Sequence, residues 1–490
     1  MSLIEIKNLT FGYDNGTDNI FDDVSFTLDT SWHTGLAGRN GRGKTTLMNL
    51  MLGRYEYRGR ISADVNFQYF PFEVEDENSL AIDLVTDISH CEDWQARREL
   101  GLLGVSEDSF YLPFALLSKG QQTKVMLAAL FLKENGFLLI DEPTNHLDTA
   151  GRQQLAKYLQ TKSGYIIVSH DRVFLDGCTD HTLYIGRSDI MLQKCSFLQF
   201  WENMQRQDKY EQDRNKTLKK DIKRLEASFK QSESWSAKAE KGKHKTADTQ
   251  GMLDRGFMGH KAEKMMQSAK NIQARQQKAI EEKQSLLKNS EFSEDLKLAV
   301  LPLPPKGFYC ENVAVSYPDK PLIDNLSFSI KQGDRLLIKG GNGTGKTSLF
   351  NCIAGLRNNY SGIIYRQNGI VISYLTQDTS FLKGSIWEYV DKNGLDRALF
   401  GAIMRKLDFS RSLFETDMST YSQGQKKKVL VAASLSSKAH IYLWDEPLNY
   451  LDLYCRNQLE NLLVSCKPTM IFSEHDAAFC DAVATNIIEL

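Results

Sequence analysis

Four motifs in this chain each occur twice. The two copies keep the same order and lie 302 to 305 residues apart. The first copies are GRNGRGKTT (38–46), LLSKGQ (116–121), LLIDEPTNHLD (138–148) and IIVSHD (166–171), and the second copies are GGNGTGKTS (340–348), TYSQGQ (420–425), YLWDEPLNYLD (442–452) and MIFSEHD (470–476). Several motifs at one spacing indicate a duplicated unit. Whatever fold the chain adopts must therefore be built twice within 490 residues.

Each copy has the sequence pattern of an α/β domain. It opens with short alternating runs, IEIKNLTFGY in the first copy and FYCENVAVSY in the second, which are typical of strands. A glycine loop and a helix-like stretch follow, and apolar strand-like runs close the copy. Alternating strands and helices with buried apolar strands favour a mainly parallel sheet covered by helices. We predict two such domains, at residues 1–198 and 305–490.

A polar, basic segment separates the copies. Residues 211–280 hold 17 Lys and Arg against 9 Asp and Glu, whereas the whole chain has a net charge of −2. Apolar residues at heptad-like spacing predict two antiparallel helices, at about 200–240 and 260–290. We predict that this helical linker covers 199–304. Its charge favours contact with a polyanion, and the alternative is a solvated spacer.

The composition is that of a soluble globular protein, with 41% hydrophobic and 25% charged residues. No apolar run approaches the ~18–20 residues that cross a membrane. The opening MSLIEIKNLT lacks the layout of a secretion signal. The eight cysteines form no CxxC pair, which favours reduced thiols. We expect a cytoplasmic protein without a membrane partner.

Both copies contain the pattern G-x-x-x-x-G-K-T. Glycines let the backbone curl so that its N–H groups point at phosphate oxygens, and the following helix adds the positive end of its dipole. The lysine neutralises terminal phosphates, and the threonine hydroxyl can bind Mg²⁺. The residues expected at these two phosphate loops are Gly38, Asn40, Gly41, Gly43, Lys44, Thr45 and Thr46, and Gly340, Asn342, Gly343, Gly345, Lys346, Thr347 and Ser348.

Acidic residues end a buried strand in each copy. Asp141 and Asp445 follow the apolar runs FLLI and IYLW, so we expect both beside the phosphate loops, where they can hold Mg²⁺ through water. The glutamate after each aspartate is placed to orient or deprotonate an attacking water. A histidine after the next strand is placed to contact the γ-phosphate, although such a histidine can also be a core residue. The expected catalytic residues are Glu142, Glu446, His170 and His475.

The Ser-x-Gly-Gln elements between phosphate loop and DE dipeptide resemble the signature of ATP-binding cassette proteins. Paired cassettes of that family sandwich ATP head to tail, with the phosphate loop of one facing the signature of the other. The resemblance implies two ATP and Mg²⁺ sites inside one monomer, with Lys44 facing the second signature and Lys346 facing the first. The signature residues are Ser118, Gly120 and Gln121, and Ser422, Gly424 and Gln425.

The resemblance also implies an aromatic residue that stacks on adenine and a glutamine that reaches Mg²⁺. Tyr13 and Tyr317 match the aromatic. Gln377 in YLTQD and Gln68 in NFQYF match the glutamine, but Gln68 follows its loop lysine by 24 residues and Gln377 by 31. The implied metal ligands are Thr45, Gln68, Asp141, Thr347, Gln377 and Asp445.

The two copies depart from the family pattern in different ways. Lys119 in the first signature, and Tyr421 and Gln423 in the second, replace the usual residues of Leu-Ser-Gly-Gly-Gln. The second copy also reads EPLNYLD where the first reads EPTNHLD. These differences predict unequal turnover at the two sites.

Two fused cassettes without membrane spans, joined by a long basic helical linker, resemble the ABC-F family. The resemblance implies a protein that binds the ribosome, with its linker at large-subunit rRNA near the tRNA exit site and beside P-site tRNA. Basic helices suit rRNA on physical grounds as well, because neutralised phosphates release counterions. An ATP-closed form would bind, and hydrolysis would release it.

Two branches of the family are possible. Housekeeping translation factors often carry an arm in the first cassette, but 68 to 118 spans 50 residues and 377 to 422 spans 45, which leaves no room for one. The compact frame resembles the antibiotic-resistance branch of the Lsa and Vga proteins. That branch protects ribosomes from pleuromutilin, lincosamide and streptogramin A drugs.

Apolar residues in the lysine-rich middle of the linker are candidates for a ribosome contact, because exposed apolar groups often mark one. The alternative is that they close the helical hairpin internally. These residues are Met252, Leu253, Phe257 and Met258. A different class of function, the ATPase component of a membrane transporter, also stays open, although such a protein has no use for a basic hairpin.

Overall fold

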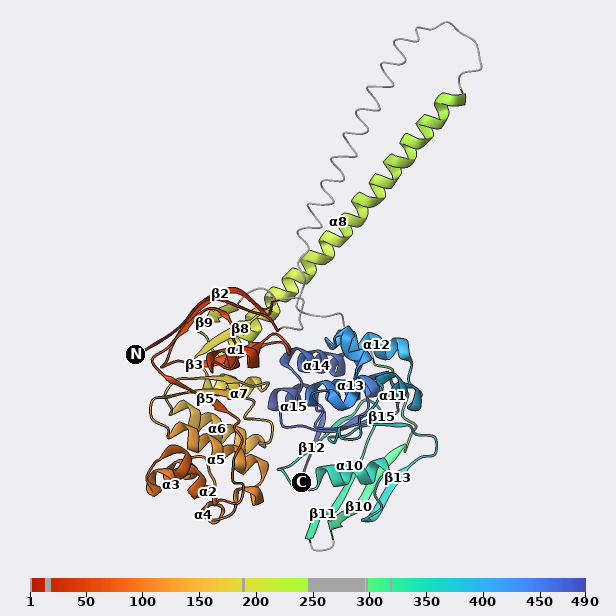
Figure 1. The fold of residues 1–490 in the computed structure, drawn as a ribbon. Helices are drawn as coiled ribbons and strands as arrows, with labels where there is room; N and C mark the ends of the chain where they lie inside the picture. Colours follow the sequence, from red (N-terminus) through yellow and green to blue (C-terminus); the bar gives the residue numbers. More distant parts are fainter. Residues whose placement is uncertain (1, 14–18, 187–189, 246–295, 297, 318–319) are drawn as a thin grey trace. The chain divides into compact units, whose positions relative to one another are not determined.

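The computed structural model describes residues 2–13, 19–186, 190–245, 296, 298–317 and 320–490 (Figure 1). The chain divides into two compact units. One unit contains both copies of the repeat, Met1–Phe200 and Glu294–Leu490, and the other is Trp201–Ser293. The domain boundaries expected at 198 and 304 stay a prediction.

The first copy combines a small antiparallel sheet with a larger, mainly parallel one. The small sheet has the order β2-β1-β4 and the large one β5-β6-β7-β3-β8-β9, in which only β9 runs antiparallel to its neighbour. The strands are β1 (Leu3–Phe11), β2 (Phe21–Asp29), β3 (His33–Gly38), β4 (Arg58–Ser62), β5 (Asn66–Phe70), β6 (Gly136–Asp141), β7 (Tyr165–Val168), β8 (His181–Ile185) and β9 (Ile190–Gln193). The helices are α1 (Lys44–Met51), α2 (Ala81–Ser89), α3 (Asp93–Leu102), α4 (Glu107–Phe110), η1 (Phe114–Leu116), α5 (Lys119–Phe131), α6 (Thr149–Gln160) and α7 (Arg172–Cys178).

The second copy repeats this topology, except that its described residues contain no counterpart of β9. Its antiparallel sheet has the order β11-β10-β13, and its parallel sheet has the order β14-β15-β16-β12-β17. The strands are β10 (Phe308–Tyr317), β11 (Lys320–Ser329), β12 (Arg335–Lys339), β13 (Tyr360–Arg366), β14 (Ile372–Leu375), β15 (Ile441–Asp445), β16 (Met470–Ser473) and β17 (Asn486–Glu489). The helices are α10 (Lys346–Ala354), α11 (Ile386–Lys392), α12 (Arg397–Lys406), η3 (Arg411–Glu415), η4 (Met418–Thr420), α13 (Gln423–Ser436), α14 (Leu453–Cys466) and α15 (Ala477–Val483). The predicted class, two tandem α/β cassette domains, is confirmed.

The central strands are buried because both faces of each parallel sheet are covered. All four residues of β7 and all five of β15 are buried, which explains their unbroken apolar sequences YIIV and IYLW. Each phosphate loop follows an internal strand of its parallel sheet, β3 or β12, and leads into α1 or α10. The aspartates that end β6 and β15 therefore lie at the same sheet edge as the two loops.

The helix α8 (Phe197–Lys245) begins directly after the first copy and is 49 residues long. It accounts for the first of the two linker helices predicted from sequence. The second predicted helix and the four apolar residues Met252, Leu253, Phe257 and Met258 lie outside the described residues. In the part of the chain that the structure describes, no helix is both long enough and apolar enough to cross a bilayer.

Candidate ATP sites

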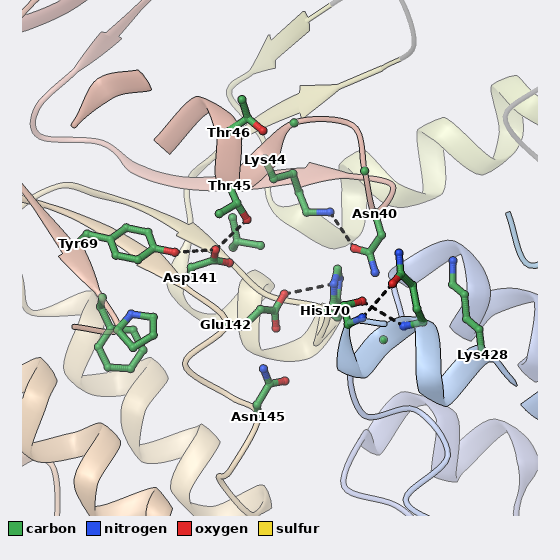
Figure 2. A pocket seen from close by; sticks show the side chains of 18 of the residues that line it. Asn40, Lys44, Thr45, Thr46, Tyr69, Asp141, Glu142, Asn145, His170 and Lys428 are labelled. Atoms are coloured by element: carbon green, nitrogen blue, oxygen red, sulfur yellow. Dashed lines mark hydrogen bonds and ion pairs between the residues drawn. The ribbon is translucent and has the colours of Figure 1, made fainter. Parts of the chain in front are cut away.

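The first cavity joins the phosphate loop of the first copy to the signature of the second. It has a volume of about 960 Å³, and Figure 2 shows the loop side chains opposite the acidic pair. Of the residues predicted for this site, the structure places the following around the cavity: Tyr13, Asn40, Gly41, Gly43, Lys44, Thr45, Thr46, Asp141, Glu142, His170, Ser422, Gly424 and Gln425.

The second cavity has the reciprocal composition and a volume of about 820 Å³. It joins the second phosphate loop to the first signature. Of the predicted residues, those around it are Ser118, Gly120, Gln121, Asn342, Gly343, Gly345, Lys346, Thr347, Ser348, Gln377, Glu446 and His475. Both cavities thus bring together residues from opposite copies, which is the head-to-tail arrangement expected from the family resemblance.

Each loop lysine is placed to receive an anion. Lys44 is buried, and its ammonium donates to the carbonyl oxygens of Gly38 and Arg39 at 2.7 and 3.2 Å. Lys346 repeats this geometry with Gly340 and Gly341, at 2.7 and 3.2 Å. Burial lowers the pKa of both lysines below the usual value for a lysine. A buried ammonium held mainly by neutral carbonyl oxygens fits the charge of a triphosphate.

Two of the oxygen ligands expected for Mg²⁺, the loop threonine and the aspartate at the strand end, lie together at both sites. Thr45 Oγ1 donates to Asp141 Oδ2 at 2.9 Å (Figure 2). Asp445 is fully buried, and its Oδ2 has no hydrogen-bond partner in the structure. Burial raises the pKa of Asp445, and the neighbouring hydroxyls of Thr347 and Ser473 act in the opposite direction. A hydroxyl beside a buried carboxylate oxygen without a partner is a donor set that fits a hard divalent cation.

The two candidate catalytic glutamates differ in their partners. Glu446 Oε2 accepts from Gln377 Nε2 at 2.8 Å and from Asn449 Nδ2 at 2.7 Å, and its Oε1 lies 3.5 Å from His475 Nε2. Neither Glu142 oxygen has a hydrogen-bond partner, and its nearest cationic candidate is His170 Nε2 at 3.3 Å. The second glutamate is therefore held by three side chains and the first by one.

Charge state follows from these surroundings. Burial and the neighbouring Asp141 raise the pKa of Glu142 to about 8. Burial alone would raise the pKa of Glu446 too, but the hydrogen bond and charge of His475 and the charges of two lysines lower it below its usual value. At pH 7 the Glu446 carboxyl is ionised and ready to accept a proton, whereas that of Glu142 is largely neutral.

Both glutamates also have a left-handed backbone, with φ of 51° at Glu142 and 47° at Glu446. Each backbone N–H donates to a carbonyl of the neighbouring strand, on Val168 at 2.9 Å and on Ser473 at 3.1 Å. A residue other than glycine in this conformation is uncommon and strained. The sheet edge fixes the turn that presents each glutamate to its cavity.

The structure does not bring Gln68 into the first site, and the assignment of Gln68 as the counterpart of Gln377 is wrong. Phe70 pairs with Ile140, and Leu375 pairs with Trp444, and both partners directly precede the aspartate of their copy. Because Phe70 therefore corresponds to Leu375, Phe72 is the residue aligned with Gln377, but Phe72 lines a different cavity. The Gln68 amide oxygen instead accepts from Lys133 Nζ at 3.3 Å.

Sequence reasoning missed the residue that does reach the first aspartate. Tyr69 OH donates to Asp141 Oδ2 at 3.1 Å (Figure 2). Successive residues of a strand point to opposite faces of the sheet, so Tyr69 faces the site and Gln68 does not. Asn449 was also missed as a partner of Glu446, although the N of EPLN was a signal that could have identified it.

The signature glycines are required by close backbone contacts. A Cβ on Gly424 would lie 2.7 Å from the carbonyl oxygen of Tyr450, and one on Gly120 would lie 3.0 Å from that of His146. Ser118 and Ser422 begin α5 and α13 as N-caps, and each bonds a Gln side chain three residues later. The signature is therefore the capped start of a helix whose end faces the cavity.

The structure describes the side chain of the expected adenine-stacking tyrosine in one copy only. Tyr13 lines the first cavity, is 45% exposed and bonds Thr46 Oγ1 at 3.0 Å. Its exposed ring is free to meet a base, so its stacking role stays a prediction. The side chain of Tyr317 lies outside the described residues. Gly38 and Gly340 do not line these two cavities, because they precede the loop's turn and hold the lysines through their carbonyls.

The raised pKa of Glu142 predicts that removing its carboxyl stabilises the protein, and that the size of this effect depends on pH. A carboxyl that binds its proton more tightly when folded lowers stability progressively as pH rises from about 4.5 to about 8. We expect Glu142→Gln, without nucleotide and in a metal chelator, to raise the free energy of unfolding by roughly 1–3 kcal/mol at pH 8 and by little near pH 5. Urea unfolding at both pH values measures this.

Glu446→Gln is the matched control for that measurement. Its carboxyl has a lowered pKa in the folded state and therefore stabilises the fold above its ordinary value of 4.5. The same substitution at 446 should lower stability at pH 8. Equal changes at the two positions would contradict the charge states derived above.

Comparison with known proteins agrees with this geometry. Residues 21–145 and 323–449, together more than half of the chain, match the family described as ABC transporter. The chain belongs to the ABC transporter family. As an ABC ATPase it hydrolyses ATP, and its two cassette matches and its relatives place it among the ABC-F ATP-binding proteins.

Three curated relatives span nearly all of this ABC ATPase. The ATP-binding protein Uup of Caulobacter vibrioides is 26% identical over 97% of this chain and 75% of its own. The ribosome protection protein VmlR of Bacillus subtilis is 27% identical over 98% and 86%. The energy-dependent translational throttle protein EttA of Haemophilus influenzae is 25% identical over 96% and 89%.

A solved structure shows the same fold. The archaeal ribosome recycling factor aABCE1, in its complex with ribosomal stalk protein aP1, aligns with a TM-score of 0.64 at 18% identity. The alignment covers 98% of this chain and 87% of that one.

The site geometry explains how this ATPase can cleave its substrate. Each loop lysine and the helix start behind it are placed to bind the phosphates. Mg²⁺, which Thr45 with Asp141 and Thr347 with Asp445 would hold, would neutralise charge on the phosphate oxygens. Glu446 is placed to accept a proton from the attacking water as the bond to the γ-phosphate breaks. Gln377, Asn449 and His475 hold that carboxylate in one orientation, so little rearrangement is needed at the moment of reaction.

Proposed function

We propose that this ATPase binds the ribosome with ATP bound, protects it from drugs of the large subunit, and is released when ATP is hydrolysed. The drug classes proposed are pleuromutilins, lincosamides and streptogramin A. We propose that the linker contacts rRNA near the tRNA exit site and P-site tRNA. The protein would act as a monomer in the cytoplasm. Support comes from one long helix and from two relatives.

The observation that carries ribosome binding is the charge on α8. Eight of its basic side chains are exposed within five helical turns: Arg206, Lys209, Arg214, Lys216, Lys219, Lys220, Lys223 and Arg224. Over Phe197–Lys245 the helix holds 13 Lys and Arg against 8 Asp and Glu. An exposed basic helix of this kind suits a phosphate backbone, because each neutralised phosphate releases counterions.

Protection is favoured over a housekeeping role by the frame of the first cassette. Between β5 and α5 the chain forms only the short helices α2, α3 and α4 and one 3-10 turn. The described residues of this stretch therefore contain no inserted arm. VmlR, whose name describes ribosome protection, aligns with 98% of the chain at 27% identity. EttA, a translational throttle by name, matches at a similar level and supports the alternative of a translation factor.

Sedimentation of a hydrolysis-deficient variant tests ribosome binding. We expect Glu142→Gln/Glu446→Gln to pellet with 70S ribosomes in ATP and to stay in the supernatant in ADP. Pelleting should weaken steeply between 50 and 200 mM salt, since phosphate contacts are salt-dependent. Recovery with membranes instead of ribosomes would support a transporter component and contradict the proposal.

Inhibitory concentrations separate protection from the housekeeping alternative. Expression in a susceptible host should raise the inhibitory concentration of at least one of the three drug classes. The same variant, which cannot hydrolyse ATP, should not restore growth with drug. If ribosomes are bound but no drug is countered, the translation-factor function is correct.

A further inference from the structure

Two charged side chains are buried behind Glu446 in the second cassette. Lys427 is 2% exposed and Glu474 is 6% exposed. The aligned signatures make Thr123 the counterpart of Lys427 in the first cassette. The strand register, in which Asp141 pairs with Val168 and Asp445 with Ser473, makes Ser169 the counterpart of Glu474. The first cassette therefore has neutral residues at both positions.

Lys427 connects the two segments that carry Gln377 and Glu446. Its ammonium donates to the carbonyl oxygens of Thr376 and Asp445, each at 3.3 Å. These carbonyls directly precede Gln377 and Glu446, whose side chains bond each other at 2.8 Å. In the first cassette the Thr123 hydroxyl bonds only within its own helix, to the Lys119 carbonyl at 3.1 Å.

Glu474 connects the turn after Glu446 to the histidine. One carboxylate oxygen accepts from the backbone N–H of Leu448 and the other from that of His475, both at 2.7 Å. In the first cassette one neutral contact, between the hydroxyls of Thr144 and Ser169 at 2.9 Å, takes this place. Leu448 corresponds to Thr144 and has no hydroxyl. The Thr–Ser pair of the first cassette is thus replaced by a Leu–Glu pair in the second.

A purely structural role explains this pair poorly. Buried charges are costly unless paired or hydrogen-bonded, and neutral groups of similar size usually serve a fold as well. The first cassette reaches the same strand order without them. What differs between the copies is the set of groups around the glutamate. Glu446 is held by Gln377, Asn449 and His475, whereas neither carboxyl oxygen of Glu142 has a hydrogen-bond partner.

We propose that Lys427 and Glu474 are positioning residues for ATP hydrolysis at the second site. Lys427 fixes Gln377 against Glu446, and Glu474 fixes His475 against the turn that follows Glu446. The second site consequently performs the chemical step faster, and the first site mainly holds nucleotide. The inference rests on the ATPase activity and is independent of ribosome binding.

Steady-state kinetics of the full-length chain test the role of Lys427. Lys427→Thr, which introduces the residue of the first cassette, should lower kcat by about 10- to 100-fold and change KM by less than about threefold. Lys426→Thr is the matched control, since it removes the same charge from the neighbouring, partly exposed position. It should keep kcat within about twofold. A kcat unchanged by Lys427→Thr, or equal losses in the two variants, would overturn the proposal.

The double variant Leu448→Thr/Glu474→Ser tests Glu474 without leaving a buried group unpaired. It recreates the Thr–Ser contact that the first cassette already folds with. We expect an unchanged melting temperature, unchanged binding of a fluorescent ATP analogue and a kcat lowered at least about fivefold. A wild-type kcat would refute the role of Glu474. Loss of nucleotide binding in step with kcat would show a merely structural role and would also refute it.

Discussion

Glu446→Gln should lower ATP hydrolysis by about 10²- to 10³-fold, and Glu142→Gln by less than about tenfold. Glutamine keeps the shape of the side chain but cannot accept a proton. At 446 this removes an ionised base held by Gln377 and Asn449. At 142 it replaces a carboxyl that no hydrogen bond orients. Phosphate release at pH 7 with saturating Mg²⁺ and ATP measures both.

One outcome would contradict this prediction. Equal losses at pH 7 would show that the two sites are equivalent and that the hydrogen bonds of Glu446 do not decide the rate.

Arg456→Ala should destabilise the protein by about 3–5 kcal/mol, as breaking a buried ion pair does. Arg456 Nη1 lies 3.2 Å from Asp476 Oδ2, and both side chains are at most 7% exposed. Its Nε also donates to the Leu451 carbonyl at 3.0 Å. Asp476 directly follows His475 and caps α15 by accepting from Phe479 N. Removing the arginine leaves a buried carboxylate without its cation.

The first cassette and the surface supply the comparisons for that experiment. Arg152 and Asp171 form the same pair at 2.8 Å, so Arg152→Ala should cost a similar amount. Arg397 pairs with Asp391 at the surface, with side chains 58% and 52% exposed, and Arg397→Ala should cost only about 0–1 kcal/mol. Urea unfolding without nucleotide measures all three. If Arg456→Ala lowered stability only as little as Arg397→Ala, the result would contradict the burial of the Arg456–Asp476 pair.

The repeated motifs were enough to predict the class of fold and most of both sites. Three motifs can be identified from a few neighbouring residues: the phosphate loop, the signature and the acidic end of a strand. In each of them the residue types are set by the local backbone conformation and by one chemical role. The position of Asp141 at a sheet edge followed from the apolar run before it. These features depend on residues close together in the sequence, and one pattern occurring twice removes most ambiguity.

What the sequence could not predict depends on register and on distant partners. Gln68 was the nearest glutamine to the first loop, but strand pairing aligns Phe72 and not Gln68 with Gln377 of the second copy. The unequal pKa values of Glu142 and Glu446 arise from side chains on other segments. The sequence does show Lys427 and Glu474 as charged residues within motifs that otherwise match between the copies. It does not show that they are buried or which groups they bond.

The left-handed backbone at Glu142 and Glu446 has an evolutionary consequence. Glycine or asparagine would hold either turn with less strain, so a chain selected only for folding has every reason to replace both glutamates. Homologues that stop turning over ATP should therefore lose these two residues early, while their phosphate loops are still intact.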